Sequence, residues 1–269
     1  MRPQSVMPLS LAEFVDRLQE SGRYTFTADQ ALRECPLSVV AFRNAALRLE
    51  RQGRLTSPRR GFFVIVPLEY RSRRTPPPSW FIDELMKFQG RAYYVALLSA
   101  AALHGAAHQQ PQEFQVMTDE PLRPTVAGSS RLRFFFKKRV TRTPVVPVKT
   151  ETGSMTVSTP EATALDLVRY LHGAGGLGNV ATVLSELAER LDPGRLVAVA
   201  EVEADVAAAQ RLGFLLERVG AADRTEPLAR WVAERRPRTI RLRAGQEAKS
   251  AAKDARWQVL VNAPLEVAE

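Results

Sequence analysis

Arginine and asparagine side chains recur on one side of a short amphipathic stretch, SVVAFRNAALRLERQG, which runs from Ser38 to Gly53. Its apolar residues repeat at helical spacing, at Phe42, Ala46 and Leu49. The polar residues of the opposite side are Arg43, Asn44, Arg48 and Arg51. In the major groove of DNA, arginine pairs with guanine edges and asparagine with adenine edges. The stretch therefore predicts a helix that begins after an N-cap at Ser38 and presents base-reading side chains.

A second pair of arginines follows directly, in GRLTSPRRGFFVIVP (residues 53–67). Two short apolar strands flank a turn in which Pro58 suits the second position and Gly61 the left-handed position that follows. Arg59 and Arg60 lie at the tip, where burial cannot explain them. Arginines at such a tip can reach backbone phosphates or the minor groove. We predict a phosphate-contacting hairpin beside the helix.

The segments that come before complete a familiar order of elements. Residues 10–22 show helical spacing after an N-cap at Ser10, and Thr27 with Gln30 forms a capping box that starts a second, short helix. Helix, short helix, turn, amphipathic helix and hairpin predict a winged helix-turn-helix. The stretch Ser38–Arg48 is then the recognition helix in a major groove, and the hairpin is the wing. The alternative is a helical domain that only packs or dimerises.

The composition changes after residue 67. The segment LEYRSRRTPPPS (68–79) predicts either a stiff, extended spacer or a surface loop that contacts phosphates through its arginines. Those possible contacts are Arg71, Arg73 and Arg74. We therefore predict a DNA-binding domain at 1–67, a basic proline-rich linker at 68–79 and a larger domain at 80–269.

Residues 80–269 mix helical and strand patterns. WFIDELMKF and YYVALLSAAALHG predict helices, whereas FQVMT and RLRFFFKK predict strands, and residues 143–159 continue as irregular strands. Pro160 opens a further helix, and the chain is mostly helical from there to Arg236. The predicted fold class is α/β (α+β), with an N-terminal winged helix-turn-helix followed by a larger mixed α/β domain.

The overall charge agrees with a polyanionic partner. The formal net charge is +9, the sequence pI is near 10.2, and the excess is mostly arginine. A single cysteine, Cys35, rules out an internal disulfide framework and fits a reducing compartment. We see no N-terminal signal pattern, and the longest uncharged stretch is shorter than the roughly 20 residues of a membrane span. The expected location is the cytoplasm, with no membrane partner.

The basic segment RRPRTIRLR near the C-terminus has two interpretations. One is a solvated edge strand protected by its charge; the other is a second contact for DNA or for an acidic partner. The arginines concerned are Arg235, Arg236, Arg238, Arg241 and Arg243.

Other motifs argue against an enzyme. Gly173–Gly178 matches the letters GxGxxG, but a helical pattern comes before it, so a connection between two helices is expected in place of a dinucleotide site. His104 and His108 lie four residues apart without an HExxH glutamate, so we expect no metal there. Acidic pairs such as Glu201 and Asp205 have the spacing of solvated helix faces. We predict no catalytic residues, no metal and no cofactor.

Three segments carry a resemblance that covers almost the whole chain. YYVALLSAAALHGAAHQQPQEFQV, STPEATALDLVRY and QRLGFLLE are similar to the C-terminal domain of the AbiEi-type antitoxins, and the N-terminal helices and hairpin resemble the winged helix of that family. These proteins are transcriptional regulators of abortive-infection toxin–antitoxin operons, described as type IV.

The resemblance implies a repressor of its own operon that binds inverted repeats in double-stranded DNA. It also implies that the second domain neutralises a nucleotidyltransferase-like toxin, functionally and without a stable complex, and that the protein is a monomer in solution or a weak dimer on DNA. The linker and C-terminal arginines are then candidate contacts for DNA or for the toxin. Two alternatives stay open: sequestration of the toxin by direct binding, and a nucleotide-binding second domain.

Overall fold

The computed structural model describes residues 9–106 and 111–265. The chain divides into two compact units, each built from several segments. The first unit contains the residues up to Ala92 together with Glu120–Phe134 and Pro147–Met155. The second contains Tyr93–Asp119, Phe135–Val146 and the residues from Thr156 on. The first unit is thus larger than the N-terminal domain predicted from the sequence.

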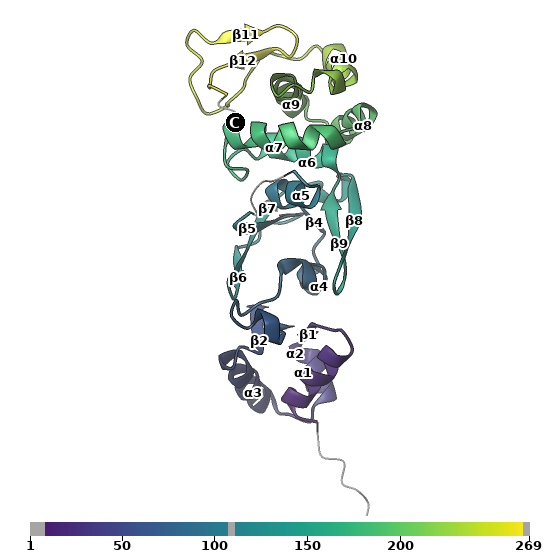
Figure 1. Ribbon diagram of the computed structural model, residues 1–269, viewed down its shortest axis with the longest axis vertical. Coiled ribbons are helices and arrows are strands. Elements are labelled where there is room, and N and C mark those ends of the chain that lie inside the picture. The colour runs from purple at the N-terminus through teal and green to yellow at the C-terminus, as the bar shows by residue number, and fades with distance from the viewer. Residues whose placement is uncertain (1–8, 107–110, 266–269) are drawn as a thin grey trace, which may run out of the picture. The chain divides into compact units, whose positions relative to one another are not determined.

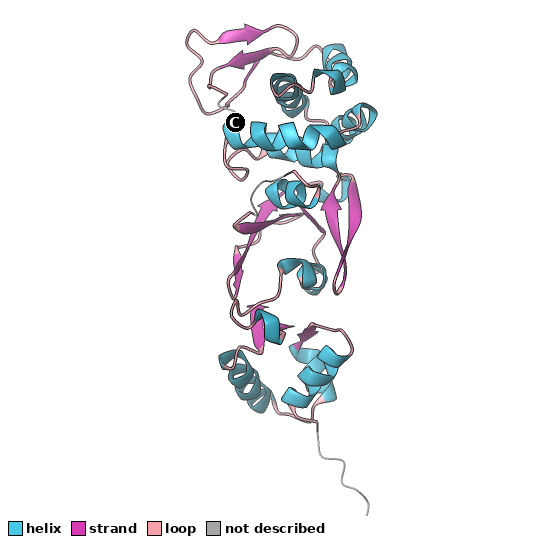
Figure 2. Ribbon diagram, viewed as in Figure 1, coloured by secondary structure: helices cyan, strands magenta, loops and turns pink. Residues whose placement is uncertain are grey.

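The first unit begins with three helices and a small antiparallel sheet (Figures 1 and 2). The sheet has the strand order β1-β3-β2. In chain order the elements are α1 (Leu11–Glu20), β1 (Thr25–Thr27), α2 (Ala28–Glu34), α3 (Val39–Arg51), β2 (Leu55–Arg59) and β3 (Phe62–Ile65).

Side chains fix where these three helices begin, as the sequence predicts. Ser10 accepts a hydrogen bond from the Glu13 amide, and the Glu13 carboxylate accepts one in return from the Ser10 amide. The Thr27 hydroxyl caps α2 by accepting from the Gln30 amide, which is the forward half of the predicted capping box, and the Ser38 hydroxyl caps α3 by accepting from the Ala41 amide. These caps satisfy amides that have no partner inside the helix. Gly53, with φ of +68°, lies just past the end of α3.

An aromatic cluster joins the helices to the sheet. Phe26 of β1 packs edge-on against Phe14 of α1 and stacks on Phe63 of β3, with ring centroids 5.3 and 5.2 Å away. Phe42 of α3 meets Phe63 edge-on at 5.6 Å. Burial of such rings is the main source of stability for a domain this small. The cluster therefore fixes which side of α3 faces inward.

The hairpin is tighter than the sequence predicts. β2 continues through Pro58 to Arg59, which pairs with Phe62, so that only Arg60 and Gly61 form the turn. The register shifts between Thr56 and Arg59. A proline has no amide for the ladder, and such an irregularity is where a strand tolerates it.

The proline-rich segment is folded. Single 3-10 turns cover Leu68–Tyr70 and Pro78–Trp80, and both Thr75 and Pro76 are buried. The segment therefore packs within the first unit through Thr75 and Pro76, and its arginines stay exposed. α4 (Ile82–Gln89) follows it.

A six-stranded sheet has the order β6-β7-β5-β4-β9-β8. β4 pairs antiparallel with β5, Tyr94 opposite Met117, and parallel with β9, Val95 opposite Val157. The predicted helix at YYVALLSAAALHG is wrong in its first residues, which form β4 because tyrosine and valine suit a central strand. The elements are β4 (Tyr93–Val95), α5 (Leu97–Leu103), β5 (Glu113–Thr118), β6 (Thr125–Ala127), β7 (Ser130–Phe136), β8 (Val145–Thr150) and β9 (Gly153–Ser158).

Helices dominate the rest of the second unit, where Figure 1 shows them gathered in one group. They are α6 (Pro160–Arg169), α7 (Leu177–Leu187), α8 (Pro193–Glu203), α9 (Val206–Arg218) and α10 (Glu226–Glu234). Residues 170–176 connect α6 to α7, as predicted, with Gly175 and Gly176 at positive φ, and Gly178 lies in the first turn of α7. A small sheet of order β10-β12-β11 ends the fold: Ile240–Arg241, Val259–Val261 and Ala252–Asp254. Among the described residues, no helix has the length and apolar character needed to cross a bilayer.

Candidate nucleic-acid interface

The outward face of α3 presents the predicted polar residues. Arg43, Asn44 and Arg48 are all exposed, and so is the capping residue Ser38. The buried residues of the helix lie on the opposite side, at Phe42, Ala46 and Leu49. The side chains predicted to read bases are therefore available to a partner.

The charge around this face is positive and unpaired. The first turn of α3 contains no acidic residue, so nothing offsets the partial positive charge of the helix N-terminus. Within residues 9–106 and 111–265, no carboxylate forms an ion pair with Arg43, Arg48 or Arg51. Asn44 and Arg48 also line a cleft of about 640 Å³ between α3 and α1. Such a face attracts an anion.

The two hairpin arginines have different surroundings. Arg60 is exposed at the turn. Arg59 is half-buried: its guanidinium donates a hydrogen bond to the Arg123 carbonyl and lies 5.8 Å from the centre of the Phe134 ring. Burial lowers the pKa of Arg59. Arg60 is thus the hairpin arginine that is free to contact a phosphate, while Arg59 already holds other parts of the first unit.

The arginines of the linker segment have exposed side chains, and the backbone carbonyls of Arg73 and Arg74 contact a loop of the first unit. Arg71, Arg73 and Arg74 are exposed, and the Arg73 carbonyl accepts a hydrogen bond from the Ser129 amide. A Cβ added to Gly128 would come within 2.5 Å of the Arg73 and Arg74 carbonyl oxygens. This close approach fixes the loop and leaves the three guanidinium groups outside it.

The five arginines predicted near the C-terminus are exposed, but they are not equivalent. Arg235 stacks on Trp231, with its guanidinium carbon 3.8 Å from the ring centre, and donates a hydrogen bond to the Trp231 carbonyl. Arg241 donates a hydrogen bond to the Gln246 carbonyl at 3.4 Å. Arg238 and Arg243 use backbone atoms in hydrogen bonds with Gln210 and Asn262, and Arg236 has a positive φ of 45°. The segment therefore serves the local fold as well as the surface.

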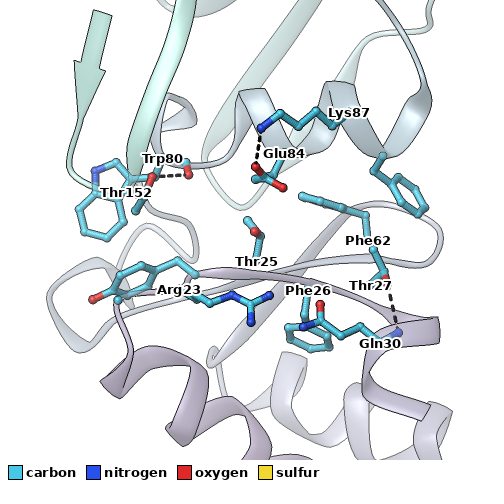
Figure 3. Close-up of a pocket in the computed structure, with 13 residues that line it drawn as sticks. Arg23, Thr25, Phe26, Thr27, Gln30, Phe62, Trp80, Glu84, Lys87 and Thr152 are labelled. Carbon is cyan, nitrogen blue, oxygen red and sulfur yellow. Dashed lines mark hydrogen bonds and ion pairs between the residues drawn. The ribbon is translucent and has the colours of Figure 1, made fainter. Parts of the chain in front are cut away.

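A second cleft lies between β1 and α4, with a volume of about 470 Å³ (Figure 3). Lys87 and Glu84 of α4 form an ion pair on one side of it, and Arg23 lies on the other. The residues that line it include one carboxylate and neither histidine nor cysteine. Paired acid–base chemistry and metal ligation both need more than that. None of the arginines predicted to bind DNA lines this cleft.

The second unit contains a buried ionic cluster that the sequence analysis missed. Lys137, directly after β7, donates hydrogen bonds to Asp166 of α6 at 2.9 Å and to Glu203 of α8 at 2.6 Å. Asp166 is 0% exposed, and Lys137 and Glu203 are each 6% exposed. Arg169 bridges Glu203 and Asp205 at 2.8 and 3.0 Å. Arg169 and Asp205 lie at its edge, with side chains 20% and 33% exposed, and we call the five residues together the buried ionic cluster.

Hydroxyl groups complete the cluster. Tyr94 of β4 donates a hydrogen bond of 2.6 Å to Asp166, and Thr143 donates one of 2.7 Å to Glu203. Asp205 also caps α9, since it accepts a hydrogen bond from the Ala208 amide. We predicted that Glu201 and Asp205 form a solvated helix face, and this prediction is wrong for Asp205. The cluster ties β4, β7, α6 and the α8–α9 corner together.

The two central carboxyl groups differ in their electrostatics. Burial raises the pKa of Asp166, and the nearby Lys137 only partly opposes this effect. Burial would also raise the pKa of Glu203, but Lys137, Arg169 and Thr143 outweigh it and hold that pKa below its ordinary value. Glu203 is thus the firmly ionised member, and Asp166 the one that takes up a proton more readily.

The histidines and the cysteine were the remaining candidates for a metal or a nucleophile. The His104 ring nitrogen lies 2.7 Å from the Ser158 carbonyl, and His108 is outside the described residues. No group of three histidine, cysteine or acidic side chains that could hold a metal occurs in the part of the chain described. Cys35 is buried, which raises the pKa of its thiol.

Comparison with known protein families assigns part of the second unit. Residues 94–218 match the family model of the AbiEi antitoxin C-terminal domain. The matched range contains the whole buried ionic cluster, from Lys137 to Asp205, together with Tyr94, which donates a hydrogen bond to it. The match supports the AbiEi-type antitoxin family, and it concerns residues 94–218 of this chain.

A solved structure shares the fold over most of the chain. The crystal structure of the RV2827C protein from Mycobacterium tuberculosis is similar with a TM-score of 0.68, at 16% sequence identity, over 93% of this chain and 90% of that one. At this identity the likeness concerns the fold alone. A comparison with curated proteins finds no match.

Proposed function

We propose that this chain is a DNA-binding transcriptional regulator whose first residues form a winged helix-turn-helix, and that it acts as the antitoxin of a toxin–antitoxin operon. The proposal carries over what the family resemblance implies: autorepression at inverted repeats and neutralisation of a nucleotidyltransferase-like toxin. The predicted division at 1–67, 68–79 and 80–269 is part of this proposal, and limited proteolysis near residues 68–79 would test it.

One observation carries the DNA-binding part. The outward face of α3 exposes Arg43, Asn44 and Arg48, lacks acidic residues in its first turn, and is followed by a hairpin with Arg60 at its turn. The order α1, β1, α2, α3, β2, β3 with a three-stranded sheet supports a winged helix, in which the third helix enters the major groove. Asn44 would read adenine, Arg43 guanine, and Arg60 a phosphate.

The experiment is a salt-titrated gel shift with the DNA directly upstream of the reading frame. With about six phosphate contacts, affinity should fall by about a thousandfold between 50 and 200 mM salt. The double variant Arg43→Ala/Asn44→Ala should lose about 1–3 kcal/mol per base contact. Arg195→Ala, which removes an exposed arginine of α8, is the charge-matched control. If both variants lost the same DNA affinity, the interaction would be nonspecific attraction between charges.

The antitoxin part rests on the family of residues 94–218. If neutralisation works without a stable complex, the toxin and this chain should elute separately in size-exclusion chromatography while the full chain still suppresses toxicity. Co-elution as a stable complex would favour direct sequestration. Stabilisation of the chain by nucleotides in a thermal-shift panel would favour the nucleotide-binding alternative.

A further inference from the structure

The outermost ridge of α3 contains apolar side chains that the fold does not use. At 100° per residue, Val40, Asn44, Leu47 and Arg51 share the direction opposite to the buried stripe. Val40 is 66% exposed and Leu47 is 45% exposed. The apolar core of the first unit contains Phe42, Ala46 and Leu49 of this helix, and neither Val40 nor Leu47 belongs to it. Both side chains are therefore available to a partner, and their place on one ridge with Asn44 and Arg51, more than their exposure, points to one.

The polar and charged neighbours of Val40 indicate which kind of partner fits this ridge. Asn44 lies one turn further along the same ridge, Arg43 and Arg48 flank it, and no acidic residue lies in the first turn. A protein partner with an apolar patch would have to desolvate these guanidinium groups. The major groove of DNA supplies phosphates for the arginines and one apolar group, the 5-methyl of thymine. The mixture of charge and small apolar side chains fits DNA best.

We propose that Val40 reads the 5-methyl group of a thymine in the operator, one helical turn from the adenine that Asn44 recognises. Leu47, about two helical turns further along α3, packs against the same major groove beyond the thymine. This inference rests on the proposed DNA-binding function and adds to it a specificity-determining residue and a base. The binding site must then contain an A·T-rich step in which a thymine methyl faces the N-terminal half of α3.

The size of the effect follows from one buried methyl group. Removing such a group costs about 0.8 kcal/mol, which corresponds to about a fourfold loss of affinity. The same loss is expected whether the methyl disappears from the DNA or its contact disappears from the protein. Since both changes remove one interaction, their combination should cost no more than either alone.

The test is a double-mutant cycle between protein and DNA. Footprinting on the upstream DNA defines the bound sequence, and a synthetic duplex with that sequence is made with each thymine replaced in turn by deoxyuridine. The full chain and its Val40→Ala variant are titrated against each duplex. At one thymine position the wild type should lose affinity about fourfold, Val40→Ala should lose about as much on the thymine duplex, and it should ignore the deoxyuridine change.

Val126→Ala is the matched control, because Val126 lies on β6 and is 64% exposed. It should leave the affinity and the deoxyuridine sensitivity unchanged. Unfolding curves of both variants check that the fold is intact, as expected for an exposed position.

Three results would overturn the inference. The first is insensitivity of the wild type to deoxyuridine at every position. The second is a loss in Val40→Ala that is the same on thymine and deoxyuridine duplexes. The third is a change in self-association of the free protein on Val40→Ala, which would make the ridge a contact between two copies of this chain. If DNA binding is intact and sensitive to Arg43→Ala/Asn44→Ala, these results remove the inference alone; absence of any DNA binding removes the proposed function as well.

Discussion

Charged side chains serve opposite purposes in two regions of this protein. On α3, Arg43, Arg48 and Arg51 stand in solvent, with no carboxylate paired to them within the described ranges. In the buried ionic cluster, Lys137 and Arg169 are each bonded to two carboxylates. The first arrangement costs the fold little and leaves its charge for a partner. The second uses its charge entirely within the fold.

The two environments predict different effects when a charge is removed. Exposed, unpaired arginines contribute little to stability, so their removal should change binding and leave unfolding almost unaffected. Buried pairs behave in the reverse way, since the removal of one member leaves an uncompensated charge in a dry environment. Variants that alter one charge at a time should therefore have different effects in the two regions.

Lys137→Met should have the largest effect. It leaves Asp166 and Glu203 without their shared cation, and breaking a buried pair in this way costs about 3–5 kcal/mol. Asp166, whose pKa burial already raises, would take up a proton and limit the loss at acidic pH. The measurement is the free energy of unfolding from urea denaturation at pH 7 and pH 5. Lys138→Met, at the exposed neighbouring position, is the control and should stay close to the wild type. Equal stability of the two variants would contradict a central role for Lys137.

Glu203→Gln should have a smaller effect that depends on pH. The pKa of Glu203 is lowered in the fold, so this carboxylate contributes stability that is present above its ordinary value near 4.5 and lost as the pH falls through its lowered value. The variant should therefore be less stable by about 2 kcal/mol at pH 7. The two proteins should converge as the pH falls below the ordinary value of 4.5 and through the lowered pKa of Glu203. Melting temperatures from pH 3.5 to 7.5 measure this. A difference that grows on acidification would mean that the pKa of Glu203 is raised.

The sequence predicted the features that depend on residues close together in the chain, such as the first residue of a helix. Ser10, Thr27 and Ser38 begin their helices as predicted, because a capping residue acts on amides only two or three positions away. Thr159 and Pro160 begin α6 for the same kind of reason. The exposed polar side of α3 followed from the spacing of Phe42, Ala46 and Leu49.

The sequence did not reveal contacts between distant residues. Lys137 and Glu203 are 66 positions apart, and no spacing within either segment indicates that they meet. Arg59 looked like a free turn residue because its partners, Arg123 and Phe134, come much later in the chain. Tyr93–Val95 looked helical because the apolar run that follows it is helical, and only pairing with β5 and β9 makes it a strand.

The smallest effects should separate the two hairpin arginines. Arg60→Ala removes an exposed guanidinium, and one lost phosphate contact lowers the salt slope by about 0.9, or the affinity about eightfold at 0.1 M salt. Because a phosphate contact carries no base information, the loss should be the same for operator and unrelated DNA. Gel shifts at several salt concentrations on both duplexes measure it.

Arg59→Ala should behave differently although it removes the same charge one residue away. Its guanidinium is committed to the Arg123 carbonyl and the Phe134 ring, so the variant should lose about 1 kcal/mol of unfolding free energy and keep its salt slope. Urea denaturation and gel shifts on both variants measure this: stability should fall in Arg59→Ala, and DNA affinity should fall in Arg60→Ala. If Arg59→Ala reduced the salt slope as much as Arg60→Ala, the Arg59 guanidinium would have to leave these contacts on DNA, and the division between charges used by the fold and charges left for a partner would not hold at the hairpin.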